Sequence, residues 1–115
     1  MDLEREQALF RENLFRFQSE KGLSEVKLSQ AIGKSNSYIQ SISSKKNMPR
    51  FSTFIAMCDV LNREPIEFFL QGEPNDYLLE TIHIAESLNE YDQRRLLEYA
   101  EQLASEQKNN KSHHQ

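Results

Sequence analysis

The sequence has few of the features that mark secreted or membrane proteins. Its single cysteine, Cys58, excludes an internal disulfide framework. No apolar run approaches the length of about eighteen residues that a membrane span needs. The first residues, MDLEREQ, are acidic and lack the basic and apolar regions of a signal peptide. We therefore expect a cytoplasmic protein without a membrane partner.

Chain breakers are also scarce. Only three glycines and three prolines occur in 115 residues, and the abundant Leu, Glu, Gln and Lys favour helix. No segment shows a convincing strand pattern, and no internal repeat is present. The length and a hydrophobic content of 37% allow one domain with a modest core and an appended element. We expect an all-α protein.

Catalytic and metal-binding patterns are missing as well. There is no phosphate-binding glycine loop, no nucleophile with a matched base, and no His, Cys and carboxylate set at ligand spacing. His83 falls on a predicted helix, while His113 and His114 lie in the tail without further ligands. We expect neither an enzyme nor a metal or cofactor.

Acidic residues are absent from one long window. Residues 26–58 contain no Asp or Glu, although the chain has 18 of them and a net charge of −4. The window holds five basic residues among Ser, Asn and Gln: Lys27, Lys34, Lys45, Lys46 and Arg50. Each Lys or Arg that faces a phosphate releases a counterion, and each carboxylate would repel it. The window favours a polyanion partner, although surface charge can also cluster by chance.

Five helices are predicted in the first part of the chain. Residues 3–20 carry Phe10, Leu14 and Phe17 on one stripe, with Gly22 just past the end. Ser24 can cap a helix over 25–32 that turns Leu28, Ala31 and Ile32 inward, and Gly33 stops it. Ser35 or Asn36 can cap a third helix that ends near Ser43 and buries Ile39 and Ile42. A polar loop over 45–50 and helices over 51–61 and 66–70 follow, with Pro65 in the first turn of the last.

The second part of the chain begins after a breaker cluster at 71–75, the predicted linker. A helix over 76–87 carries Leu78, Ile82, Ala85 and Leu88 on one face, and Asn89 can cap a last helix to about residue 106. The polar residues 108–115 are predicted to be a disordered tail. Residues 1–70 have a net charge of +1, whereas 71–115 have −5. The acidic half is unsuited to nucleic acid.

The segment GLSEVKLSQAIGKSNSYIQSISSKKNMPRFSTFIAMCDVLNREPIEFF resembles the phage repressor/Cro-like helix-turn-helix family, also called the XRE family. The resemblance covers residues 10–70. It implies a five-helix, lambda-repressor-like DNA-binding domain over 1–70, with one or two additional helices over 76–107. By position, the resemblance makes the third helix the reader of the DNA major groove.

The same resemblance assigns roles to individual residues, and side-chain chemistry agrees with it. Asn and Gln can bond adenine with two hydrogen bonds, and Ser can bond either partner. The expected base readers are Asn36, Ser37, Gln40 and Ser41. The expected DNA backbone contacts are Ser24, Lys27, Lys34, Ser35, Tyr38, Lys45, Lys46 and Arg50. Simpler interpretations of these residues remain open. In these, the expected base readers form only a solvated polar face, the basic residues form an ordinary charged loop, and Tyr38 only packs on the second helix.

Four positions depart from the family pattern. Glu25 stands where relatives often have Gln, and its carboxylate opposes a phosphate. Gln18 and Ser43 replace an Arg and a Glu that relatives tend to pair, so both charges are missing together. Lys45 stands in place of a Gly, which can strain a left-handed turn, and Ser29 in place of a small Ala.

Residues 76–107 are the expected dimerisation or interaction region, because relatives bind pseudo-palindromic sites as two-fold dimers. The expected contact residues are Leu78, Ile82, Leu88, Leu96, Tyr99 and Leu103. The alternatives are that these helices fold back on the same chain or bind a regulatory protein. We predict a homodimeric, sequence-specific regulator of double-stranded DNA, acting as a repressor. The alternative is an antitoxin-like protein-interaction module with weak DNA affinity, an option that Glu25 keeps open.

Overall fold

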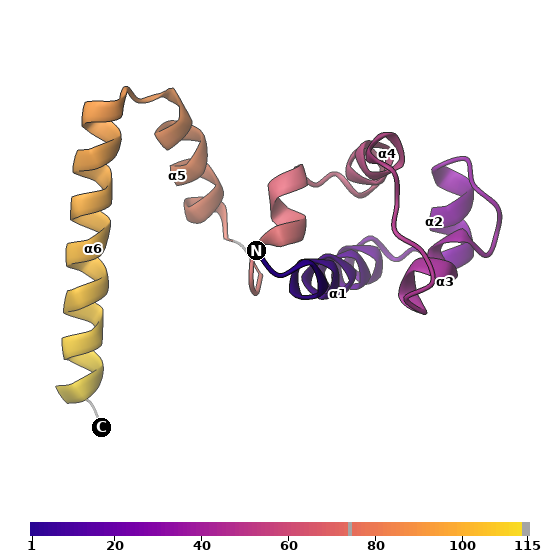
Figure 1. Cartoon of the computed structure of the whole chain (residues 1–115), viewed down its shortest axis with the longest axis horizontal. Helices are drawn as coiled ribbons and strands as arrows, with labels where there is room; N and C mark the ends of the chain where they lie inside the picture. Colours follow the sequence, from indigo (N-terminus) through magenta and orange to yellow (C-terminus); the bar gives the residue numbers. More distant parts are fainter. Residues whose placement is uncertain (74, 114–115) are drawn as a thin grey trace. The chain divides into compact units, whose positions relative to one another are not determined.

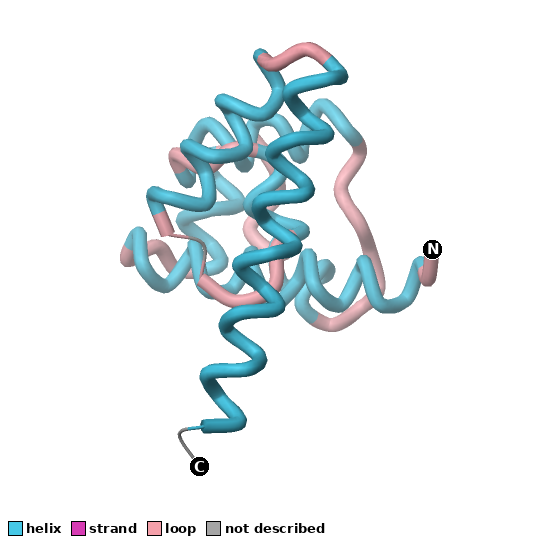
Figure 2. Tube along the Cα trace, turned by 90° about the vertical axis from the view of Figure 1, so that its left-hand side faces the viewer, coloured by secondary structure: helices cyan, strands magenta, loops and turns pink. Residues whose placement is uncertain are grey.

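The computed structural model describes residues 1–73 and 75–113. These residues form helices and loops only, as Figures 1 and 2 show. They belong to two compact units, Met1–Glu73 and Pro74–Gln115. None of the helices within the described ranges is long and apolar enough to cross a membrane. The expectation of an all-α protein is confirmed.

The first unit begins with its longest helix, α1 (Leu3–Lys21). The Asp2 side chain caps its N-terminus by accepting hydrogen bonds from the backbone N–H groups of Glu4 and Arg5. Gly22 ends it in the left-handed conformation at φ +72°, where a residue without a Cβ has no steric penalty. The predicted stop at Gly22 is therefore confirmed.

Four shorter elements follow α1 in the first unit: α2 (Glu25–Ala31), α3 (Tyr38–Ser43), α4 (Phe51–Leu61) and the 3₁₀ helix η1 (Pro65–Phe69). The prediction of an α-helix over 66–70 was wrong in type. Pro65 fixes the first turn, and Glu67 caps it by accepting from the Glu64 N–H at 2.7 Å. One such turn suffices to bring Phe68 into the core, and Leu70 is already extended.

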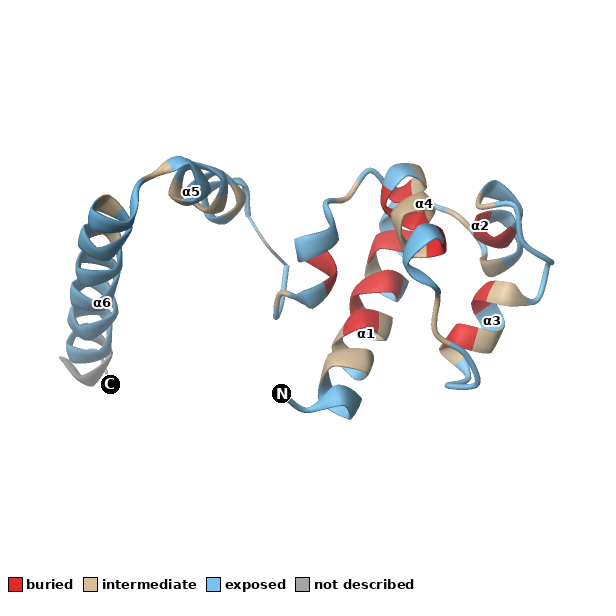
Figure 3. Cartoon of the chain, turned by 45° about the horizontal axis from the view of Figure 1, so that its top comes forward, coloured by how far each residue is buried: buried red, intermediate tan, exposed pale blue. Residues whose placement is uncertain are grey.

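One hydrophobic core holds the first unit together, and Figure 3 shows its buried residues on α1 to α4 and η1. Phe10 stacks on Phe68 with ring centroids 5.4 Å apart, and Phe17 meets Phe68 edge-on at 5.0 Å. The predicted core residues of α1 and α3 are buried, together with Leu28, Met57, Cys58 and Leu61. Ala31 is exposed, contrary to prediction, because it lies roughly 100° around α2 from the buried stripe.

Asn13 and Arg16 of α1 fasten the end of the first unit. The buried Asn13 amide donates to the carbonyl oxygens of Phe68 at 2.7 Å and Leu70 at 3.0 Å. Arg16 donates to the Gly72 carbonyl and lies 3.3 Å from the Glu73 carboxylate. These contacts hold residues 68–73 against α1, so the first unit is ordered up to its last residue.

The second unit is a hairpin of α5 (Asp76–Ser87) and α6 (Glu90–His113). Asn75 and Asn89 cap the two helices by accepting from Leu78 N and Asp92 N. The predicted disordered tail was wrong for residues 108–113, which continue α6, while residues 114–115 lie outside the described ranges. The reason is local: no Gly or Pro interrupts the stretch, so no residue there ends the helix.

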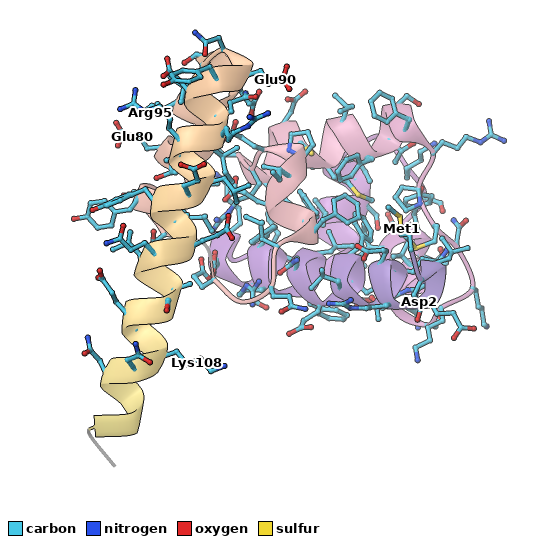
Figure 4. All side chains as sticks on the ribbon, turned by 60° about the vertical axis from the view of Figure 1, so that its left-hand side comes forward. Met1, Asp2, Glu80, Glu90, Arg95 and Lys108 are labelled. Carbon is cyan, nitrogen blue, oxygen red and sulfur yellow. The ribbon has the colours of Figure 1, made fainter. Side chains whose placement is uncertain are left out.

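No side chain of the hairpin is buried between residues 75 and 110, as the lack of buried residues on α5 and α6 in Figure 3 illustrates. Charged side chains such as Glu80, Glu90, Arg95 and Lys108 project from its helices in Figure 4. An apolar groove of about 460 Å³ runs between the helices, lined by Thr81, Ile82, Ala85, Glu86, Gln93, Leu96, Leu97 and Ala100. Of the predicted contact residues, Ile82, Leu88 and Leu96 are half-buried and Leu78, Tyr99 and Leu103 are exposed.

Candidate nucleic-acid interface

The helices α2 and α3 are joined by a tight turn centred on Gly33. Ser24 caps α2 as predicted, with its hydroxyl oxygen 3.0 Å from Lys27 N. Gly33 has a φ of +74°, and Lys34 N then donates to the Ser29 carbonyl at 2.9 Å. This left-handed residue turns the chain sharply after α2, and only six residues separate α2 from α3. The result is two short helices packed together, visible in Figure 1.

The N-terminus of α3 is capped from another helix. The expected caps, Ser35 and Asn36, do not act: α3 begins at Tyr38, and its N-cap residue Ser37 makes no side-chain capping bond. Instead the hydroxyl of Ser29, 0% exposed, accepts from Ile39 N at 3.1 Å and donates to the Glu25 carbonyl at 2.7 Å. Buried Ser29 thus satisfies an N–H that α3 cannot bond within itself.

The C-terminus of α3 is fixed from α1. Arg11 Nε donates to the carbonyl oxygen of Ile42 at 2.9 Å. Lys45 then adopts the left-handed conformation at φ +66°, and the N–H groups of Lys45 and Lys46 bond back to Ile42 and Ser41. Both ends of this six-residue helix are therefore held by side chains from neighbouring helices, which fixes its direction without long helical pairing.

The outer face of α3 and of the turn before it is polar and open. Asn36, Ser37 and Gln40 are exposed, whereas Ile39 and Ile42 on the inner face are buried. A shallow depression of about 280 Å³ is lined by Ser37, Gln40, Ser41, Ser44 and Lys46. Three of the four predicted base readers thus share one hollow with a lysine. Ser41 is half-buried, and its hydroxyl donates to the Tyr38 carbonyl at 2.5 Å.

The five basic side chains of the acid-free window are all exposed: Lys27, Lys34, Lys45, Lys46 and Arg50. None forms an ion pair with any residue in the described ranges. Lys34 Nζ lies 5.5 Å from the ring centroid of half-buried Tyr38, so the ring supports the ammonium group. Lys45 is set apart from the shared hollow, because it lines another one with Glu4, Gln7, Ala8 and Arg11 of α1.

Of the residues that depart from the family pattern, only Glu25 carries a carboxylate. It is half-buried, and its Oε1 lies 3.2 Å from Ser43 Oγ, whose single hydrogen is shared with the Ile39 carbonyl oxygen, also at 3.2 Å. Ser43 thus ties the carboxylate to the end of α3, and the positive end of the α2 dipole also favours its charge. Glu25 and Ser43 form a neutral-to-charged hydrogen bond, which involves only Ser43 of the two positions, 18 and 43, where relatives pair an Arg with a Glu.

Sequence reasoning missed four residues that shape this surface: Arg11, Ser29, Gln30 and Ser44. Arg11 and Ser29 hold the ends of α3, and Ser44 lines the hollow. Gln30 is exposed on α2, and its amide Nε2 lies 3.1 Å from Asn36 Oδ1. Ser29, Gln30 and Ser44 stand in the acid-free window, and Ser29 also departs from the family pattern, whereas Arg11 left no signal in the sequence.

Comparison with known proteins agrees with the geometry. Residues 17–68 match the family model described as helix-turn-helix, from the last turn and a half of α1 to Phe68 in η1. No curated protein and no solved structure matches the chain significantly. The matched range contains α2, the Gly33 turn, α3 and all five basic residues of the window. Residues 17–68 therefore match the helix-turn-helix family in sequence and contain the two short helices and tight turn of that motif, which supports the predicted resemblance to the Cro-like family.

Proposed function

We propose that this protein is a sequence-specific regulator of double-stranded DNA, with α3 in the major groove. The observation that carries the proposal is the exposed outer face of α3, where Gln40 and Ser37 lie beside Lys46 without a neighbouring acid. Amide and hydroxyl groups read base edges, and unpaired lysines bind phosphates. Base readout falls to Asn36, Ser37, Gln40 and Ser41, and Ser41 can accept from a base while its hydroxyl hydrogen stays bonded to the Tyr38 carbonyl.

Backbone contacts fall to the residues around this face. Ser24 at the start of α2, Lys27, Lys34, Ser35, Tyr38, Lys45, Lys46 and Arg50 form a rim of donors and cations. The Tyr38 ring lies against the Lys34 ammonium group, and this arrangement suits a phosphate contact by the lysine. Four or five phosphates per subunit give an affinity whose logarithm falls with the logarithm of salt at a slope of about −4 per subunit.

The second copy of this chain is the proposed partner of the α5–α6 hairpin. Two helices of 12 and 24 residues that bury no side chain within 75–110 lack the packing that stabilises helices in water. Leu97 at 58%, Tyr99 at 59% and Leu103 at 46% exposure present an apolar surface beside the groove. A two-fold pairing covers the same surface on both copies and places two α3 helices on a pseudo-palindromic operator.

Repression follows from this arrangement when the operator overlaps a promoter. The apolar groove also fits the second candidate function, an interaction module whose hairpin binds a different protein. The sequence position of Glu25, where its carboxylate would oppose a phosphate, favoured that alternative. The structure weakens this support, because one carboxylate oxygen of Glu25 is hydrogen-bonded to Ser43.

Selection of bound sites from a random DNA pool tests the central proposal. A palindromic consensus with half-sites about 34 Å apart is expected. Gln40→Ala should cost about 1–3 kcal/mol on the selected site and little on random DNA, while Lys46→Ala should weaken all sequences alike. Equal behaviour of the two variants, or no enriched sequence, contradicts base readout by α3.

The oligomer needs a separate measurement. Leu97→Glu should dissociate the dimer in sedimentation experiments, whereas Ser105→Glu adds the same charge at an exposed polar site of α6 and should leave it intact. If the wild-type protein is monomeric at every concentration, the proposed homodimer is wrong, and the groove is then the site for a different protein.

A further inference from the structure

Gln30 and Asn36 are joined through their side-chain amides. Nε2 of Gln30, on α2, donates to Oδ1 of Asn36, in the turn before α3, at 3.1 Å. Both side chains are exposed, so the bond lies on the surface that faces outward between the two helices. Gln30 has no role in the family resemblance, and the bond bridges six residues of chain across the Gly33 turn.

The bond leaves Asn36 able to read a base. An amide carries two N–H donors and a carbonyl oxygen with two lone pairs, and the contact with Gln30 uses one lone pair of Asn36. Both Nδ2 hydrogens and the second lone pair remain. Adenine presents an acceptor at N7 and a donor at N6 in the major groove, which these groups match. Turning both amides over reverses donor and acceptor but keeps the pair joined.

Gln40 provides the contrast on the same face. It is exposed and makes no side-chain hydrogen bond to any described residue. Binding DNA must therefore order the Gln40 side chain, whereas Asn36 is already held before DNA arrives. Ordering a side chain lowers affinity, and a contact made in advance removes that loss.

We infer that Gln30 is a positioning residue for adenine readout by Asn36, so that discrimination at one base pair depends on a residue of α2. This inference rests on the proposed DNA-reading function of α3. Its consequence is energetic coupling: Gln30 contributes to specificity only while Asn36 is present. A phosphate contact by Gln30 alone would instead act on all sequences and independently of Asn36.

A double-mutant cycle tests the coupling. The proteins are the full-length wild type, Gln30→Ala, Asn36→Ala and the double variant. The probes are the selected DNA site and a site with the base pair read by Asn36 changed from A·T to G·C. That base pair is the position where Asn36→Ala loses its preference. Gln30→Ala should reduce affinity for the selected site about three- to tenfold and affinity for the changed site little. In the Asn36→Ala background it should have no further effect.

Lys27→Ala is the matched control, because Lys27 is also exposed on α2 and expected at the backbone. Its effect should be the same on both sites and should add to that of Asn36→Ala. Additive effects of Gln30→Ala and Asn36→Ala overturn the inference while leaving DNA recognition intact. Absence of any sequence preference in the wild type instead overturns the proposed function. Unchanged thermal unfolding of each variant shows that the exposed substitutions leave the fold in place.

Discussion

The hydroxyl of Ser29 in α2 lies 3.1 Å from the backbone nitrogen of Ile39 in α3 and is its hydrogen-bond acceptor. Both residues are fully buried, so water cannot replace this bond. The family usually has Ala at this position, and the serine here supplies a cap that α3 otherwise lacks. The hydroxyl therefore adds a direct hydrogen bond between two helices that also pack through Leu28, Ile39 and Ile42.

We predict that Ser29→Ala destabilises the domain by about 1–2 kcal/mol, because it leaves the Ile39 N–H buried without an acceptor. Urea unfolding at neutral pH measures the change. Ser37→Ala is the control: Ser37 stands at the N-cap position but makes no capping bond, so its loss should cost less than about 0.5 kcal/mol. Equal costs for the two variants would contradict capping by Ser29.

Lys45→Gly should separate stability from DNA binding. Lys45 has a φ of +66°, which costs a residue with a Cβ roughly 1–2 kcal/mol, and glycine avoids that cost. Allowing for the greater freedom of glycine in the unfolded chain, we expect a gain of about 0.5–1 kcal/mol. DNA affinity should fall on all sequences because a cation is lost.

Lys46→Gly serves as the comparison for Lys45→Gly, since Lys46 has a negative φ. It should weaken DNA binding as well but lower the unfolding free energy. A Lys45→Gly protein that is less stable than the wild type would show that the left-handed turn is not strained.

Glu25→Gln should raise DNA affinity at a small cost in stability. Removing the carboxylate takes away a repulsion of roughly 1 kcal/mol with a nearby phosphate, or about fivefold in affinity at low salt. The gain should shrink as salt increases. The loss of the charge at the start of α2, which also turns the bond from Ser43 into a weaker neutral one, should cost about 0.3–1 kcal/mol.

Fluorescence anisotropy across a salt series measures the effect of Glu25→Gln, with Glu12→Gln on the exposed surface of α1 as the charge-matched control. Affinity that is unchanged in Glu25→Gln, or raised equally in both variants, would place Glu25 away from the DNA.

We predict that the buried thiol of Cys58 makes the folded protein less stable at alkaline pH. Burial, aided by the charge of Asp59, raises the pKa of the Cys58 thiol from 9.0 to about 11. The unfolded chain therefore loses this proton first, so the contribution to stability is complete below pH 9 and is lost as the pH rises to about 11. The difference in unfolding free energy between wild type and Cys58→Ala should narrow over this range. A constant difference would mean that the thiol does not titrate differently on folding.

The helices of this protein were largely predictable because periodicity and capping residues agree. Phe10, Leu14 and Phe17 mark one stripe of α1, and Gly22 ends it. The start of α3 was not predictable. Ser35 and Asn36 have side chains that can cap a helix, but it is the buried Ser29 hydroxyl that accepts from the first turn of α3. The 3₁₀ form of η1 depends on the capping by Glu67 and on the position of Phe68 in the core, which no local pattern records.

The candidate site was predictable in its composition and not in its connections. The absence of acids from 26–58 identified the exposed cations and the polar face of α3. Bonds between helices, such as Arg11 to Ile42 and Gln30 to Asn36, depend on how the helices pack. Residues joined in this way are 31 and 6 positions apart and share no periodicity.

The hairpin of α5 and α6 has a consequence for how the protein responds to its own abundance. Since no side chain from 75 to 110 is enclosed by the hairpin itself, its order must come from whatever covers Leu97 and its neighbours. If a second copy does so, dilution unwinds this half while the aromatic cluster around Phe68 keeps the other half intact. Occupancy of a paired site then rises with the square of the subunit concentration. DNA binding therefore changes over a narrower range of protein concentration than it would for a monomer.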